Sequence, residues 1–168
     1  YNAMLMVDDA HATGVLGKNG RGTLEYLGIE NQDIIQMCTM GKAIGSFGAY
    51  TAGSKKLIDY LINKARSFIY TTALPPAVCV ASIAAIDIIE NQPELRQNLW
   101  DRIRYFRKGL KEAGIKVMSE ESHIVPIFIG DAKKAVEISN KLFEKGIFIQ
   151  AIRPPTVPGG TSRLRITL

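Results

Sequence analysis

The chain has 168 residues, of which 46% are hydrophobic and 22% are charged, which predicts a soluble globular protein with a real core rather than a disordered segment. The net charge of +5 comes from dispersed basic residues, so nucleic acid is not an expected partner. No apolar stretch approaches the roughly 20 residues needed to cross a bilayer, so no membrane association is expected either.

Two short apolar runs near the start, residues 4–7 and 34–38, are bounded by polar or glycine residues. Such runs are typical of strands that are buried on both faces of a parallel sheet. Residues 48–52 are a weaker strand candidate. Apolar residues at helical spacing then predict a helix over 55–64, with Ser54 as its N-cap.

Two longer helices follow in the middle of the chain. The paired Pro75 and Pro76 suit the first turn of a helix that continues to about Asn91. Residues 94–113 form an amphipathic pattern with one apolar stripe, and Gly114 should end this second helix.

Beyond Gly114, short apolar runs alternate with one amphipathic stretch, which Asp131 should cap and which should end near Lys145. The apolar runs predict short strands at 115–118, 124–129, 147–152 and 164–167. Alternating strands and helices indicate an α/β protein. We expect a partial parallel-sheet domain over 1–91 and a smaller α+β domain over 92–168. Because the chain begins and ends inside apparent strands, we also expect it to be a piece of a longer chain.

The two cysteines, Cys38 and Cys79, lie in apolar sequence surroundings. Neither has a second cysteine or a histidine at metal-binding spacing, so no metal site is expected. Both are predicted to be buried free thiols in a reducing compartment, which indicates a cytoplasmic protein.

Lys42 is the most informative residue for function. It lies between Gly41 and Gly45, directly after the predicted strand 34–38. A desolvated lysine can form an imine with an aldehyde and can act as a base. Thr39 could place its hydroxyl on a phosphate. The alternative interpretation of Lys42 is a turn lysine that faces water.

Asp8 and His11 follow the first apolar run. An acid that pairs with a pyridine nitrogen keeps the nitrogen protonated, and a nearby imidazole can hydrogen-bond the oxygen of the same ring. With Lys42, these residue types suggest a pyridoxal phosphate site. Asp9 competes with Asp8, but Asp8 directly follows the strand and lies three residues before His11. The alternatives are a turn cap for Asp8 and a structural turn histidine for His11. Glycines within 14–22 allow tight turns.

Two further places could bind anions. Thr71 and Thr72 precede the helix at Pro75, where hydroxyls and free amides can hold a phosphate, including one bound to a partner subunit. Simple helix capping is the alternative. Arg163 and Arg165 share a strand face and could grip a carboxylate through two hydrogen bonds, or they could protect a sheet edge.

Together these segments resemble the α-oxoamine synthases, which are fold-type-I pyridoxal phosphate enzymes. Residues 8–14, 20–22, 39–43 and 69–76 carry the resemblance. It implies an aspartate aminotransferase-like fold, with part of the large-domain sheet followed by a smaller domain. The resemblance extends over the whole chain but covers about the second half of such an enzyme. The family's ring-stacking histidine and first phosphate-binding loop precede this region.

The resemblance also implies a role for each matching position. Lys42 would be the Schiff-base lysine, and Asp8 would be the partner of the pyridinium nitrogen. His11 would hydrogen-bond the ring oxygen, and Thr39 would bind the phosphate. Two residues of the C-terminal part would contact substrate, and they are Thr156 and Arg165, with Arg165 on the amino-acid carboxylate.

Residues 151–158 most resemble a member that condenses L-alanine with pimeloyl-coenzyme A, or with the carrier-protein thioester, in biotin biosynthesis. The resemblance implies a homodimer with a shared active site. Two alternatives stay open: a relative that joins glycine to acetyl-coenzyme A, and a catalytically silent fragment that serves in dimerisation. We expect the 168-residue piece to be inactive by itself.

Overall fold

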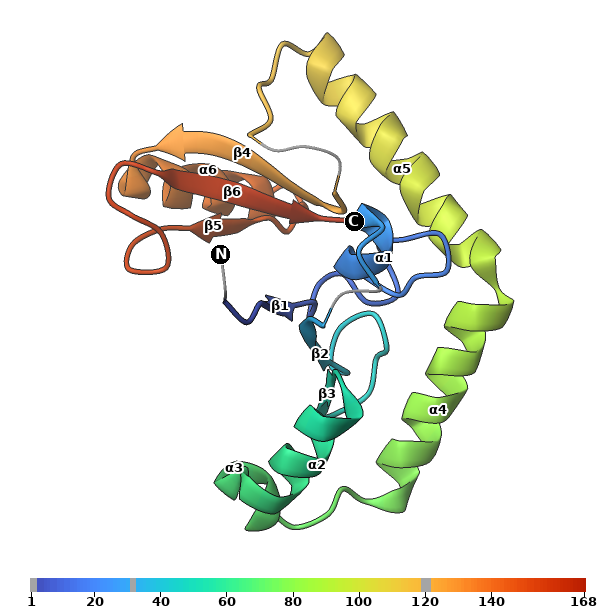
Figure 1. Ribbon diagram of the computed structural model, residues 1–168. Helices are drawn as coiled ribbons and strands as arrows, with labels where there is room; N and C mark the ends of the chain where they lie inside the picture. The colour runs from blue at the N-terminus through green and yellow to red at the C-terminus, as the bar shows by residue number, and fades with distance from the viewer. Residues whose placement is uncertain (1–2, 31–32, 119–121) are drawn as a thin grey trace. The chain divides into compact units, whose positions relative to one another are not determined.

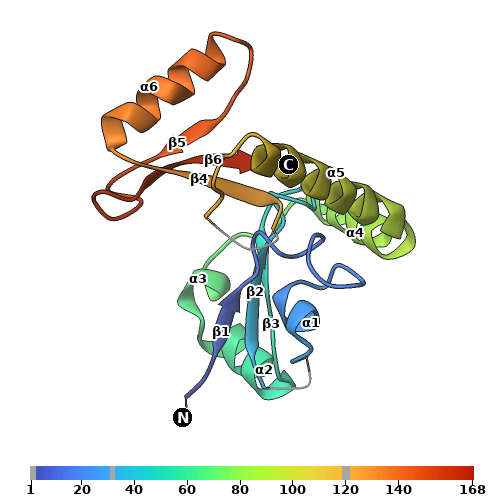
Figure 2. The same ribbon diagram turned by 90° about the horizontal axis from the view of Figure 1, so that it is seen from above.

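The computed structural model describes residues 3–30, 33–118 and 122–168. The chain divides into two compact units, Tyr1–Arg96 and Gln97–Leu168. Figure 1 shows the helices and strands in chain order, and Figure 2 shows them from a second direction. No helix in these described ranges is long and apolar enough to cross a membrane.

The first unit contains a three-stranded sheet in the order β1-β2-β3. β1 (Met6–Asp8) runs parallel to β2 (Ile35–Thr39), and β3 (Ala49–Ala52) runs antiparallel to β2 (Figure 2). All three predicted strands of this region are therefore confirmed. Because β1 and β2 are parallel, Asp8 and Thr39 end their strands at the same edge of the sheet.

The strand register determines which side chains share a face of this sheet. Asp8 pairs with Met37, and Cys38 pairs with Tyr50. Successive side chains of a strand point to opposite faces. Asp8 and Thr39 therefore lie on one face, whereas Cys38 and Tyr50 lie on the other.

The expectation that the early strands are buried on both faces is wrong for β1. Met4, Leu5 and Met6 are 87%, 51% and 57% exposed. The physical reason is that β1 is the edge strand of the sheet, with β2 as its neighbour on one side. β2 lies at the centre of the sheet, and its Cys38 is fully buried.

The structure confirms the two predicted helices of the first unit and adds two short helices that the sequence did not predict. α1 (Thr23–Leu27) and α3 (Arg66–Ile69) are short. α2 (Lys55–Lys64) begins after Ser54, which takes the N-cap position without a side-chain hydrogen bond. α4 (Pro76–Asn91) begins with proline in its first turn, as expected.

The prediction that both cysteines are buried is right for Cys38 and wrong for Cys79, which is exposed on α4. α4 has apolar residues on every side, so its sequence does not reveal which side is covered. Val80 and Ile83, on the same helix, are also more than half exposed.

α5 (Pro93–Glu112) confirms the second long helix, and the division between the two units at Arg96 falls within it. Gly114 has φ +72°, a left-handed conformation that glycine adopts without strain. The amide of Ile115 donates to the carbonyl of Leu110 at 2.9 Å, which completes the helix end.

The second unit contains an antiparallel sheet in the order β4-β6-β5, and α6 contacts all three strands. Its elements are β4 (Ile124–Gly130), α6 (Ala132–Phe143), β5 (Gln150–Ile152) and β6 (Ser162–Thr167). Asp131 caps α6 as predicted, because its carboxylate accepts a 2.7 Å hydrogen bond from the amide of Lys134.

Two predicted strands of this unit need correction. Residues 115–118 form one isolated bridge to β4 instead of a strand, because the amide of Ile115 is used by the end of α5. Residues 147–149 lie outside β5. There the amide of Ile147 bonds back to α6, and Ser139 of α6 donates to the carbonyl that precedes β5. Helix ends thus take up backbone groups that a longer strand would need.

Candidate active site

The loop that carries Lys42 lies directly after β2, at the carboxyl edge of the first sheet. The amide of Met40 donates to the carbonyl of Gly48 at 2.9 Å, and the amide of Ser46 donates to the carbonyl of Met40 at 2.8 Å. The amide of Gly45 donates to the carbonyl of Lys42 itself at 2.9 Å. These bonds close the loop, so Lys42 has a defined place beside the end of β2.

Contacts with α4 brace the same loop. The hydroxyl of Ser82, which is 5% exposed, donates to Ser46 Oγ at 2.9 Å. Ser46 Oγ in turn donates to the carbonyl of Val78 at 3.2 Å. The loop is therefore fixed to a long helix.

Lys42 and Thr39 are in direct contact. Lys42 Nζ donates to Thr39 Oγ1 at 3.0 Å, while the lysine side chain is otherwise exposed. Thr39 is half-buried at the end of β2. The contact places an amine and a hydroxyl side by side where a ligand can reach both.

The two neighbouring acids have different environments. Asp8 is exposed, and its Oδ1 accepts a 2.9 Å hydrogen bond from the amide of Ala10. Asp9 is completely buried, and its Oδ2 accepts hydrogen bonds from the amide of Thr23 at 3.0 Å and from Gln36 Nε2. An accessible carboxylate is the one that can meet a ligand, which supports the prediction for Asp8.

His11 and the two threonines are also accessible. His11 is exposed in the turn after Asp9. Thr71 and Thr72 are exposed, and Thr71 Oγ1 donates to the carbonyl of Ser67 at 2.6 Å. Pro75 takes the N-cap position of α4 without a side-chain hydrogen bond. Thr71 therefore completes the end of α3 and does not cap α4.

The remaining predicted residues belong to the second unit. Thr156 is exposed in a turn where its amide donates to the carbonyl of Arg153 at 3.1 Å. Arg165 is half-buried on β6, where residues alternate between a buried face and a more open one. Arg163 shares the open face, but its Nε donates to the carbonyl of Thr161 at 3.0 Å and so stabilises its own loop.

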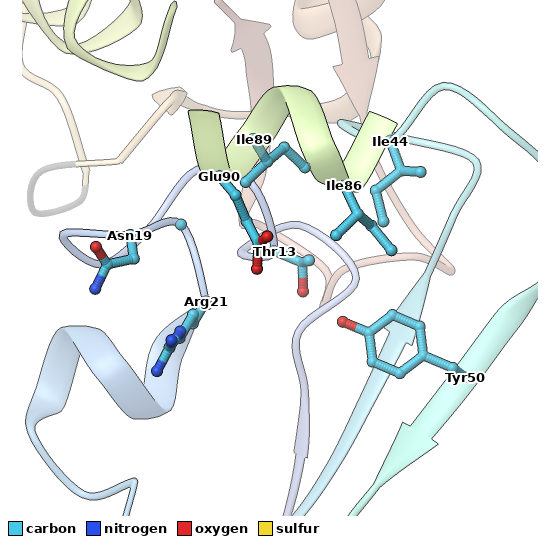
Figure 3. Close-up of a pocket in the computed structure, with 9 residues that line it drawn as sticks. Thr13, Asn19, Arg21, Ile44, Tyr50, Ile86, Ile89 and Glu90 are labelled. Atoms are coloured by element: carbon cyan, nitrogen blue, oxygen red, sulfur yellow. The ribbon is translucent and has the colours of Figure 1, made fainter. Parts of the chain in front are cut away.

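A cavity of about 310 Å³ opens on the other face of the first sheet. In Figure 3 the Tyr50 side chain extends toward Thr13, while isoleucines of α4 line the opposite wall. The lining residues are Thr13, Asn19, Gly20, Arg21, Ile44, Tyr50, Ile86, Ile89 and Glu90. Lys42 and Asp8 are not among them, so the cavity is separate from the predicted site.

Tyr50 and its neighbours were not identified from the sequence. Burial raises the pKa of Tyr50 to about 12, hydrogen bonding to the Cys38 thiol adds to this rise, and hydrogen bonding to Thr13 opposes it. Thr13 Oγ1 and Cys38 Sγ lie 2.9 Å apart. Only the pairing of Cys38 with Tyr50 across two strands could have revealed this group, and that register is not visible in a linear pattern.

The sheet order, the lysine loop and the exposed acid agree with a family assignment. The aminotransferase class I and II family model matches residues 1–168, and the chain belongs to this family. Among curated relatives, the 8-amino-7-oxononanoate synthase of Geotalea daltonii is 54% identical over 170 residues, covering 100% of this chain and 43% of the relative. That of Geobacter metallireducens is 53% identical, covering 100% of this chain and 44% of the relative.

Solved structures show the same similarity. An 8-amino-7-oxononanoate synthase from Francisella tularensis has a TM-score of 0.86 and 36% identity, covering 98% of this chain and 48% of that one. A serine palmitoyltransferase from S. paucimobilis with a bound PLP–myriocin aldimine has a TM-score of 0.92 and 31% identity, covering 99% and 42%. The predicted family resemblance and fold class are confirmed, and the chain spans less than half the length of these relatives.

Proposed function

We propose that this chain is part of an enzyme that condenses L-alanine with pimeloyl-coenzyme A or a pimeloyl-carrier protein. The products are 8-amino-7-oxononanoate, carbon dioxide and the free thiol carrier. The chain is 54% identical along its whole length to a curated 8-amino-7-oxononanoate synthase, which supports the substrate assignment. The observation that carries the chemistry is the exposed Lys42 amine, held 3.0 Å from Thr39 at the sheet edge where Asp8 also ends its strand.

The residues at this edge fit pyridoxal phosphate, which the serine palmitoyltransferase neighbour binds. An aldehyde needs an amine, a pyridine nitrogen needs an acid, and a phosphate needs hydroxyl donors. Lys42 and the exposed Asp8 supply the first two, and Thr39 supplies a hydroxyl. When bound, the cofactor supplies an electron sink for the α-carbon of the substrate.

Side chains of this chain would bind the cofactor and the substrate and would transfer the proton. Lys42 would hold the cofactor and then move a proton at the α-carbon through Nζ, which Thr39 Oγ1 orients. The Asp8 carboxylate would keep a proton on the pyridine nitrogen, and His11 would hydrogen-bond the ring oxygen. Arg165 would bind the alanine carboxylate with two parallel hydrogen bonds, and Thr156 would contact the substrate.

At the level of the whole protein, residues 1–91 would belong to the cofactor-binding domain and residues 92–168 to the small domain. The enzyme would be a cytoplasmic homodimer whose subunits share each active site, with Thr71 or Thr72 reaching the partner's cofactor. Because this chain covers 43% of a relative, the experiments below use the protein at the full length of its relatives, called here the full-length protein.

Lys42→Ala in the full-length protein tests the chemistry. After incubation with pyridoxal phosphate and borohydride, mass spectrometry of the parent should find one adduct, on Lys42. The variant should carry none and should lose roughly 10²–10⁴-fold or more in turnover, the typical contribution of a proton-transfer group. Lys64→Ala, at the exposed end of α2, is the control and should keep both. A Lys42→Ala variant as active as its parent would overturn the proposal.

The substrates are tested by a separate comparison. Turnover of L-alanine with pimeloyl thioester is measured beside turnover of glycine with acetyl-coenzyme A. The proposal expects the first pair to react faster. Reaction of the glycine pair alone would reassign the substrates and leave the roles of Lys42 and Asp8 in place.

A further inference from the structure

Asp9 is a completely buried carboxylate with no assigned role. Oδ2 accepts hydrogen bonds from the amide of Thr23 at 3.0 Å and from Gln36 Nε2. Oδ1 is also buried, and it has no hydrogen-bond partner among the described residues. Burying a carboxylate is unfavourable unless its hydrogen bonds compensate. The two hydrogen bonds to Oδ2 therefore hold this side chain in one place in the fold.

The backbone of Asp9 is equally engaged. Its amide donates to the carbonyl of Met37 in β2 at 2.7 Å. Its carbonyl accepts from the amides of Ala12 at 2.9 Å and Thr13 at 3.1 Å, which closes the turn that contains His11. One residue thus joins the end of β1, the central strand β2, the His11 turn and, through Thr23, the start of α1.

Asp8 depends on this arrangement. Asp8 and Asp9 share a peptide bond, and their side chains point to opposite faces of the sheet. A backbone shift that accommodates displacement of the Asp9 side chain would therefore also reorient Asp8. His11 lies in the turn that the Asp9 carbonyl closes, so it would move with the same backbone.

We propose that Asp9 is a positioning residue, whose buried carboxylate fixes the turn from Asp8 to His11 in the orientation that binds the cofactor ring. The proposal rests on the proposed function, since it concerns the same site. Asp9 touches neither cofactor nor substrate in this role. It acts through the geometry of Asp8 and His11.

Two glycines offer a pair of variants that leave Asp9 itself intact. Gly22 has φ +99°, and a Cβ there would lie 2.3 Å from Asp9 Oδ2, so the carboxylate would have to move. Gly28 has φ +68°, and a Cβ there would meet nothing within 4 Å. Alanine strains the backbone at both positions, more at Gly22, where φ +99° and ψ −157° suit essentially glycine alone, than at Gly28, where φ +68° and ψ +31° are left-handed helical. Only at Gly22 does it also displace the carboxylate, and thermal unfolding measures the difference in strain.

The experiment measures the dissociation constant of pyridoxal phosphate and its visible circular dichroism band in the full-length protein. The band reports how rigidly the ring is held. Gly22→Ala should weaken binding by about tenfold relative to Gly28→Ala, the factor that corresponds to one hydrogen bond, and should change the band. Thermal unfolding of the cofactor-free variants shows how much each loses in stability alone.

Substitutions of Asp9 complete the test. Asp9→Ala should weaken binding like Gly22→Ala, and hydrogen exchange at the Thr23 amide should become faster in the cofactor-free protein. Asp9→Asn should keep most of the affinity, because its amide oxygen can accept both hydrogen bonds. If Asp9→Ala does not fold, the glycine pair decides.

Each failure has its own signature. A parent protein that binds no pyridoxal phosphate overturns the proposed function and this inference with it. A parent that binds, together with equal dissociation constants and equal bands for Gly22→Ala and Gly28→Ala, overturns the positioning role alone. Unchanged binding and an unchanged band in a folded Asp9→Ala variant would do the same.

Discussion

Thr39 connects the end of β2 to the proposed cofactor site. It is the last residue of β2, and its hydroxyl accepts the hydrogen bond from Lys42 Nζ. The proposed function gives it a second task as a phosphate ligand. A threonine hydroxyl can serve both, because it accepts through lone pairs and donates one hydrogen.

Thr39→Val should therefore weaken binding of pyridoxal phosphate by about tenfold, since it keeps the shape and removes one hydrogen-bonding hydroxyl. Thr39→Ser keeps the hydroxyl and is the matched control. Titration of the full-length variants with the cofactor, followed by absorbance, measures the effect. Equal affinity for the valine and serine variants would show that the Thr39 hydroxyl does not contact the phosphate.

The raised pKa of Tyr50 makes the free energy of unfolding depend on pH in alkaline solution. Burial raises its pKa from 10.0 to about 12. Between these values the unfolded chain has released the phenolic proton while the folded chain retains it, so the free energy of unfolding falls as pH rises through this window. Below pH 10.0, the pKa of tyrosine in the unfolded chain, the stabilising contribution of protonated Tyr50 is fully present.

Tyr50→Phe should make that decline less steep, because phenylalanine has no proton to release. Urea unfolding of parent and variant at about pH 9 and about pH 11 gives the two slopes. Loss of the hydroxyl changes the variant's free energy of unfolding by a similar amount at both pH values. The comparison therefore concerns how much each protein's free energy of unfolding falls between the two pH values. Parallel slopes for the two proteins would contradict the burial of this phenol.

At this scale the sequence predicts residues that are defined by their place along a strand. Lys42 and Asp8 follow apolar runs, and the structure puts both at the carboxyl edge of one sheet. The burial of Asp9 was not predictable in this way. It depends on Gln36, which is 27 positions away in the chain, and on the face to which each strand residue points.

The loop between β1 and α1 shows how one side chain can organise an element. Glu25, in the first turn of α1, accepts hydrogen bonds from the amides of Asn19 and Arg21, both at 3.0 Å. A Cβ on Gly17 would overlap Glu25 Oε2, so a larger residue there would push this carboxylate aside. The sequence predicted a glycine-rich turn here, but it did not show which acid the turn surrounds.

Glu25→Ala should lower the free energy of unfolding by about 1 kcal/mol, a value reduced for solvent screening because this carboxylate is largely accessible. Burial acts to raise the pKa of Glu25, but hydrogen bonds from Arg21 and Asn19 outweigh it and hold the pKa below its ordinary value of 4.5. The contribution is therefore present above that value and is lost as pH falls through the lower, folded-state pKa.

Chemical denaturation at about pH 7 and about pH 3 tests this. The difference between parent and Glu25→Ala should shrink at the acidic pH. Glu25→Gln is the control, because its amide oxygen can still accept one bond while its charge is absent at both pH values. A difference that is equal at the two pH values would contradict the role of the ionised carboxylate.

The length of β5 cannot be predicted from the pattern of apolar residues. Residues 147–149 continue the apolar run of β5, yet their backbone groups bond to α6. Hydrophobicity predicts that such a segment is attached to the core. It does not predict whether a sheet or a helix end takes its amides, because that depends on tertiary contacts.

For the whole molecule, the exposed edge of the first sheet is the most consequential feature. Met4 and Met6 are 87% and 57% exposed on or beside β1. The relatives that this chain matches are more than twice its length, since the chain covers 43% of one and 44% of another. We infer that other parts of the full-length protein cover this edge, because an uncovered apolar strand edge favours aggregation.

Met6→Lys distinguishes an open β1 edge from one that other parts of the protein cover. In the isolated 168-residue chain the new charge would face water, so the free energy of unfolding should change by about 0.5 kcal/mol or less. In the full-length protein the same lysine would be buried without a partner, and the loss should be about 2 kcal/mol or more. We also expect the isolated chain to bind a hydrophobic dye and to form no product. The full-length protein should form product and bind little of the dye. Equal effects of Met6→Lys in both proteins would mean that β1 remains an open edge, and product formation by the isolated chain would show that these residues suffice for catalysis.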